Sequence, residues 1–201
     1  VVEPYDIPNS WTKFRACDYG YGSYTGVVWI AITPAEQLVV YRELYVTKVT
    51  ATDLADMVLE ADGEDNIRYG VLDSSLWHKR GDTGPSLAEQ MIMKGCRWRP
   101  SDRSRGSRVS GKNELHRRLQ VDEFTEEPRL VFFNSCINTI SQLPALPLDK
   151  NNPEDVDTNS EDHLYDALRY GVMTRPKSNL FDFDPNNHTT GFQMSDATFG
   201  Y

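Results

Sequence analysis

The first residue of this chain that could do chemistry is a carboxylate at the end of a short, largely apolar stretch. Asp18 follows residues 14–17, which have the composition of a central strand. An ionised carboxylate in such a place is costly unless it is paired or binds a cation. Gly20 and Gly22 follow it and would let a backbone, metal or ligand approach closely. The alternative is an ordinary turn, because Asp-x-Gly is common turn chemistry.

Further titratable residues occur at two later places in the chain. Asp73 directly follows the apolar pair Val71-Leu72, as Asp18 follows its own strand. Asp162, His163 and Asp166 have i, i+4 and i, i+3 spacings, so that all three can share one face of a helix. If the two strands are neighbours, their aspartates emerge at one sheet edge, and a helix across that edge would add a third carboxylate. A histidine alone is more often structural than a ligand.

Each of these carboxylates also has an ordinary explanation. Asp73 precedes two serines and could begin a turn or cap a helix. Asp162 could simply interact with the dipole of the helix that follows it. Asp166 lies beside apolar positions of the same helix, and either Arg169 or Arg175 could pair with it.

The combination of these groups favours a divalent metal site. Carboxylates held close together repel one another unless a cation neutralises them. Oxygen ligands with one imidazole suit Mg²⁺ or Mn²⁺ better than zinc. Two such ions about 3.5–4 Å apart form a clamp for in-line attack on a phosphodiester. The sequence therefore predicts two-metal phosphodiester chemistry.

The elements that must position these groups follow from hydrophobic periodicity and turn residues. Three strands joined by short loops predict an antiparallel meander, and alternating strands and helices after it predict parallel strands with crossovers. The fold class expected is therefore α/β, with a mixed sheet flanked by helices. Strands are predicted at 14–18, 27–33, 37–45, 68–73, 129–134 and, weakly, 97–100; helices are predicted at 50–60, 86–95, 113–121, 135–143 and 161–173, with Thr50 or Thr52 and Ser160 as N-caps.

Composition limits the class of protein. The 201 residues suffice for one good-sized domain, and no apolar run is long enough for a membrane span. The three cysteines are odd in number and widely spaced, which favours buried thiols in a reducing compartment. The chain begins with Val1, so we expect it to be part of a longer protein.

A basic strip stands out in a chain of net charge −9. Residues 94–118 carry nine Lys or Arg and two acidic residues, which is how an acidic protein can still bind a polyanion. Residues 101–111 are rich in Ser, Arg and Gly, and we expect a mobile loop there. The alternative is a solvated basic loop without a ligand. The candidate contacts to such a polyanion are Lys79, Arg80, Arg103, Arg105, Arg108 and Lys112.

Four segments together resemble the nuclease domain of a tailed-bacteriophage terminase large subunit. They are residues 18–20, 71–73, 152–158 and 161–170, of which the last is the most specific, and the resemblance spans roughly residues 8–175. It implies an RNase H-like fold and a Mg²⁺- or Mn²⁺-dependent endonuclease that cuts concatemeric phage DNA during packaging. Carried over by motif, it implies catalytic roles for Asp18, Asp73 and Asp166, and metal binding by these three with Asp162 and His163 as rivals for the third ligand position.

The resemblance also sets expectations for organisation and partners. We expect a lead-in at 1–13, the nuclease domain at 14–175 and a tail at 176–201. No G-x-x-x-x-G-K-[ST] phosphate loop is present, so the ATPase domain of the family would lie elsewhere in the full-length chain. Expected partners are double-stranded DNA, this ATPase domain, the small terminase subunit and the portal, in the host cytoplasm and without a membrane.

Two other readings stay open from the sequence. The chain could be another RNase H-like nuclease of the resolvase or transposase type. It could also be a non-catalytic module that docks on DNA or on the portal.

Overall fold

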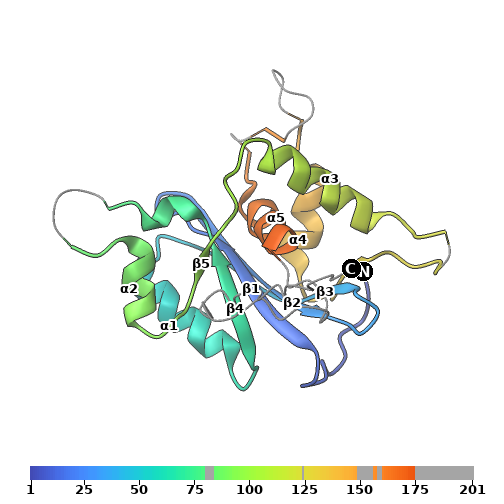
Figure 1. Ribbon diagram of the computed structural model, residues 1–201, viewed down its shortest axis with the longest axis horizontal. Coiled ribbons are helices and arrows are strands. Elements are labelled where there is room, and N and C mark those ends of the chain that lie inside the picture. The colour runs from blue at the N-terminus through green and yellow to red at the C-terminus, as the bar shows by residue number, and fades with distance from the viewer. Residues whose placement is uncertain (80–83, 124, 149–155, 158–159, 175–201) are drawn as a thin grey trace, which may run out of the picture.

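Six strands form one mixed sheet in the order β5-β4-β1-β2-β3-β6 (Figure 1). The computed structural model describes residues 1–79, 84–123, 125–148, 156–157 and 160–174. β1, β2 and β3 are an antiparallel meander, whereas β4 pairs with β1, β5 with β4 and β6 with β3 in parallel. This is the mixed sheet that the sequence predicts. The strands are β1 Thr12–Asp18, β2 Tyr24–Ile32, β3 Leu38–Thr47, β4 Ile67–Leu72, β5 Arg99–Pro100 and β6 Leu130–Phe132.

Helices cover the sheet on both sides. In Figure 1, α1 and α2 lie on one side of the strands, and α3, α4 and α5 lie on the other. Within the described ranges none of these helices is long and apolar enough to cross a membrane. The α-helices are α1 Ala51–Asp62, α2 Leu87–Met93, α3 Ser107–Leu119, α4 Ile137–Gln142 and α5 His163–Thr174, and short 3-10 turns occupy Ser74–Trp77 and Leu143–Ala145.

The alternation of side chains along β1 decides which helix each residue meets. Successive strand residues point to opposite faces of a sheet. Phe14 and Ala16 pack against Gly171 of α5. Arg15, between them, points to the other face and forms a buried ion pair with Asp62 of α1. Asp18 shares the parity of Phe14 and therefore belongs to the α5 face.

The α1 face contains a buried polar cluster around Asp62. Arg15 donates to one carboxylate oxygen of Asp62, and the indole Nε1 of Trp29 donates to the other at 2.8 Å. The Arg15 guanidinium also lies 4.6 Å from the ring centroid of Trp98, over its face. Arg15 is only 3% exposed, so this charge depends on these partners.

Several element boundaries differ from the predicted ones. β1 begins at Thr12, and Val2 forms a parallel bridge with Phe133, so the first residues of the chain pack on the sheet. Thr50 caps α1, with its side chain accepting from the backbone N–H of Asp53, and Thr52 does not. The domain limits themselves stay a prediction, and the tail 176–201 and residues 152–155 lie outside the described residues.

The largest difference concerns α3, which begins at Ser107 rather than at residue 113. The predicted loop therefore ends at Gly106, whose φ of +84° is in the left-handed region that glycine tolerates. A Cβ on Gly111 would lie 2.5 Å from Cγ of Arg169 on α5. The absence of this atom lets α3 pack closely on α5, and that packing outweighs the weak helix propensity of Ser and Gly.

Helix α5 begins later than predicted. The structure has its first residue at His163 instead of 161. The backbone N–H of Asp166 donates to the carbonyl of Asp162 in the first turn. The residue at the N-cap position is therefore Asp162, and Ser160 does not cap the helix. Residues 164–172 are all buried, so α5 is a central helix of the protein.

Candidate active site

The two strand-end aspartates lie at the same edge of the sheet, as expected for parallel neighbours. Asp18 is the last residue of β1 and is paired with Gly26 of β2. Asp73 directly follows β4, and its backbone N–H donates to the carbonyl of Cys17 at 3.3 Å. The parallel pairing of β1 with β4 thus brings the two residues side by side.

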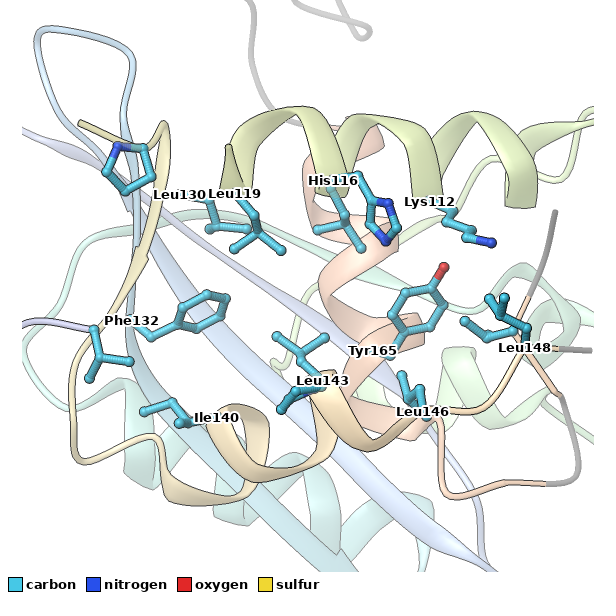
Figure 2. Close-up of a pocket in the computed structure, with 15 residues that line it drawn as sticks. Lys112, His116, Leu119, Leu130, Phe132, Ile140, Leu143, Leu146, Leu148 and Tyr165 are labelled. Carbon is cyan, nitrogen blue, oxygen red and sulfur yellow. The ribbon is translucent and has the colours of Figure 1, made fainter. Parts of the chain in front are cut away.

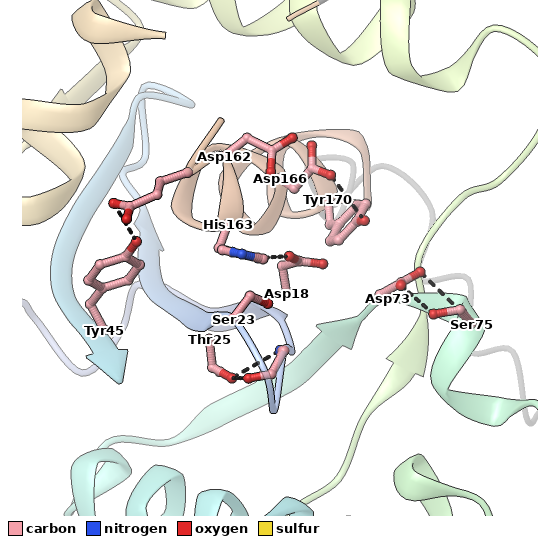
Figure 3. Close-up of polar contacts among 12 residues, drawn as sticks. Asp18, Ser23, Thr25, Tyr45, Asp73, Ser75, Asp162, His163, Asp166 and Tyr170 are labelled. Atoms are coloured by element: carbon pink, nitrogen blue, oxygen red, sulfur yellow. Dashed lines mark hydrogen bonds and ion pairs between the residues drawn. The ribbon is translucent and has the colours of Figure 1, made fainter. Parts of the chain in front are cut away.

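Helix α5 delivers the third group of side chains to this edge. Figure 3 shows His163 and Asp18 pointing toward each other, with Asp162 and Asp166 above them. The distance from His163 Nδ1 to Asp18 Oδ2 is 2.7 Å. The Asp18 hydrogen bond and negative charge raise the pKa of His163 and favour an imidazolium that donates to Asp18.

Gly26 allows α5 to begin so close to β2. A Cβ on Gly26 would lie 2.9 Å from the backbone carbon of His163 and from the backbone nitrogen of Leu164. Gly26 is not among the site residues predicted from the sequence. A glycine inside the β-branched run of β2 is the signal that could have found it, since such a glycine often marks a close approach of backbones.

We therefore expect Gly26→Ala to move the start of α5 and weaken the contact between His163 and Asp18. Overpacking of this kind costs about 1–3 kcal/mol of the free energy of unfolding. The pKa of His163 should move back toward its ordinary value, which an NMR titration of the imidazole would measure. Gly22→Ala is the control, because no atom lies within 4 Å of its added Cβ. An unchanged His163 pKa in Gly26→Ala would contradict the role of this glycine.

Burial and neighbouring negative charges disfavour the charged forms of Asp18 and Asp162. Burial raises the pKa of Asp18, and the negative charges of Asp166 and Asp73 add to this. Burial and the charge of Asp166 raise the pKa of Asp162 to about 6. Such a cluster gains from a cation placed among its oxygens.

Two arginines supply positive charge to the α5 carboxylates. Arg108 of α3 lies between them, with Nη1 3.0 Å from Asp166 Oδ2 and Nη2 3.6 Å from Asp162 Oδ2. Arg169 Nε donates to the other oxygen of Asp166 at 3.0 Å. The pairing of Asp166 with Arg169, an alternative open from the sequence, is therefore present.

Asp73 has the capping contact that the sequence left open. Its side chain accepts from the backbone N–H of Ser75 at 3.1 Å and from the Ser75 hydroxyl, and it caps the turn Ser74–Trp77. In Figure 3 the Asp73 carboxylate points toward Ser75 and away from Asp18. In the part of the chain that the structure describes, no three Asp, Glu, His or Cys side chains are already arranged to hold a metal ion.

The chemistry of the donor set nonetheless suits a divalent cation. Carboxylate oxygens with one imidazole are the ligands of Mg²⁺ or Mn²⁺. The Arg108 guanidinium supplies a positive charge between the carboxylates of Asp162 and Asp166. The predicted site residues Asp18, Asp162, His163 and Asp166 are gathered here, and Asp73 lies beside them with its side chain turned aside.

The predicted DNA-contacting residues fall into different surroundings. Lys79, Arg103 and Arg105 are exposed, and Arg80 lies outside the described residues. Arg108 lies on the carboxylates rather than on an open surface. Lys112 is only 7% exposed, on the side of α3 that packs inward, and its contact to DNA stays a prediction.

A separate apolar cavity of about 480 Å³ lies between α3, β6 and the segment after α4 (Figure 2). Leu115, Phe132, Ile140 and Leu143 are among its lining residues. It shares no residue with the carboxylate cluster, so we do not assign the chemistry to it.

Comparison with known proteins shows likeness at the level of structure. No family model matches the chain, and no curated protein matches it. The nuclease domain of the P22 large terminase is similar over 87% of this chain and 86% of that one, with a TM-score of 0.68 and 20% identity. The large terminase nuclease of the thermophilic phage G20c with bound cobalt is similar over 87% and 86%, with a TM-score of 0.60 and 13% identity.

A longer protein is among the similar structures. The large terminase of the thermophilic bacteriophage D6E has a TM-score of 0.65 and 14% identity over 84% of this chain, which spans 41% of that protein. The G20c nuclease has also been solved with bound zinc. The chain therefore has the RNase H-like fold of large terminase nuclease domains, as the resemblance implied.

Proposed function

We propose that this chain is a divalent-metal-dependent DNA endonuclease that cuts concatemeric phage DNA during genome packaging. The observation that carries the proposal is the contact between Asp18 of β1 and His163 of α5, at the edge where Asp73, Asp162 and Asp166 also lie. The fold that this chain shares with large terminase nuclease domains supports it.

The positions of the side chains support the roles that we propose for them. We assign catalytic roles to Asp18, Asp73 and Asp166, with Asp162 and His163 as further metal ligands. Two bound Mg²⁺ or Mn²⁺ ions would activate a water and stabilise the departing oxygen. His163 orients the Asp18 carboxylate through their hydrogen bond, and Asp73 would turn from Ser75 to join the ligands.

The DNA would approach over the exposed basic residues near this edge. Lys79, Arg103 and Arg105 are exposed and can reach phosphates, which gives affinity without sequence choice. Arg80, next to Lys79 in the sequence, is a further candidate contact to phosphate. In a longer protein of the D6E kind, an ATPase domain would accompany this domain, with the small subunit and portal as partners in the host cytoplasm.

Cleavage of supercoiled plasmid tests the proposal. We expect nicked and linear DNA with Mg²⁺ or Mn²⁺ and intact plasmid with EDTA, because phosphodiester hydrolysis at this carboxylate cluster needs the cation. Gel electrophoresis over time would measure it. Preferred cutting of branched junctions over linear duplex would indicate a resolvase-type nuclease instead.

One observation favours a second candidate function. Arg108 already neutralises Asp162 and Asp166, as it would in a domain that binds DNA without cutting it. DNA binding in a gel-shift assay, with no cleavage under either metal, would support that function.

A further inference from the structure

The two arginines at the α5 carboxylates differ in how firmly they are held. The Arg169 side chain is 4% exposed, lies on the same helix as Asp166 and has its guanidinium 4.6 Å from the ring centroid of Tyr170. The Arg108 side chain is 31% exposed and reaches across from the first turn of α3. The contacts of Arg169 are therefore more deeply buried than those of Arg108.

The Arg108 guanidinium lies between two carboxylates that the proposed function assigns to metal binding. Its two terminal nitrogens face one oxygen each of Asp162 and Asp166. A divalent cation on those oxygens would lie against the guanidinium, and like charges at such distances repel strongly in a partly buried site. The guanidinium and the metal therefore cannot both occupy the space between the two carboxylates.

We propose that Arg108 is the counter-ion of the metal-free site and competes with the divalent metal for Asp162 and Asp166. This inference rests on the proposed function of the same site. Metal entry displaces the Arg108 side chain toward solvent, at the start of α3 and close in sequence to Arg103 and Arg105. There the guanidinium can bind a DNA phosphate.

The competition links metal binding to DNA binding. A phosphate that pairs with the displaced Arg108 removes the competitor from the carboxylates. DNA should therefore raise the affinity for metal, and metal should raise the affinity for DNA by the same factor. The site would favour metal loading when the substrate is present.

The test is Mn²⁺ binding to the intact chain, measured by calorimetry and by the electron paramagnetic resonance signal of free Mn²⁺. We expect Arg108→Ala to bind Mn²⁺ about tenfold more tightly than wild type, since a partly exposed charge next to the ion is removed. Its metal-free melting temperature should fall, and the rise in melting temperature on adding Mn²⁺ should be larger. Arg108→Lys, which keeps the charge and loses the two-pronged contact, should lie between the two.

Arg105→Ala is the matched control, because it removes the same charge from the neighbouring exposed loop. We expect its Mn²⁺ affinity to stay within about twofold of wild type, as exposed charges are largely screened. Unchanged or weaker Mn²⁺ binding in Arg108→Ala would overturn the inference and leave a structural ion pair. If Arg108→Ala does not fold, Arg108→Gln takes its place with the same expected result.

Failure of the inference can be told apart from failure of the proposed function. Wild-type cleavage that needs metal, together with unchanged Mn²⁺ affinity in Arg108→Ala, would remove only the competition. Wild-type protein that neither binds Mn²⁺ nor cuts plasmid would remove both.

Discussion

Asp18→Asn should abolish metal-dependent plasmid cleavage and leave the fold intact. Asn keeps the shape of the side chain but removes the charge from the one carboxylate that contacts His163 and lies beside Asp73. We expect the cleavage rate to fall by more than about a hundredfold, because loss of groups that merely support metal ligands already costs about 10–100-fold. Time courses with Mn²⁺ and with Mg²⁺ would measure it.

This result needs two controls. One measures the folding of Asp18→Asn, and the other changes a remote carboxylate. Circular dichroism and the melting temperature should stay near wild type, since burial already disfavours the charged form of Asp18. Asp6→Asn changes the same group at an exposed position and should cut DNA like wild type. Cleavage by Asp18→Asn within about tenfold of wild type would exclude this carboxylate from catalysis.

The largest effect on stability is expected from Asp62→Ala. Asp62 is the buried partner of Arg15 and also accepts from Trp29 Nε1 at 2.8 Å. Removing it leaves a guanidinium that is 3% exposed without its carboxylate. Breaking one side of a buried pair costs about 3–5 kcal/mol. Urea unfolding followed by tryptophan fluorescence and circular dichroism would measure the loss.

Asp56→Ala on the same helix is the matched control. Asp56 pairs with Lys94 at 2.7 Å, but both side chains are largely in solvent. Exposed pairs contribute about 0–1 kcal/mol, so this variant should unfold close to wild type. Equal losses of unfolding free energy in the two variants would mean that the burial of Asp62 does not contribute to stability.

The strand pattern of the first half of the chain could be predicted because its signals are local. The β-branched runs of β2 and β3, joined by a short turn, can hardly form anything but a hairpin. The helix between β3 and β4 then predicts a crossover and a parallel strand, but not that β1 is the neighbour of β4. The sequence places Asp18 and Asp73 at one edge on the condition that β1 and β4 are neighbours, and the observed pairing meets that condition.

The start and the rotation of the helices at the site were harder to predict from the sequence, because tertiary packing determines both. The start of α3 depends on the contact of Gly111 with Arg169, more than fifty residues away in the sequence. The rotation of α5, which brings His163 to Asp18 and Asp166 to Arg108, depends on the same packing. A periodic pattern shows which residues share a face but not which partner that face meets.

The opposite-facing residues of β1 have a consequence for how the chain reaches its native pairing. A slip of one residue along β2 would carry every side chain of β1 to the other face. Asp18 would then face α1, and Arg15 would face α5 and lose Asp62. The buried bond between Arg15 and Asp62 penalises that slip, since it can form only in the native register. The ion pair on the α1 face of the sheet thus favours the strand register that places Asp18 at the candidate active site.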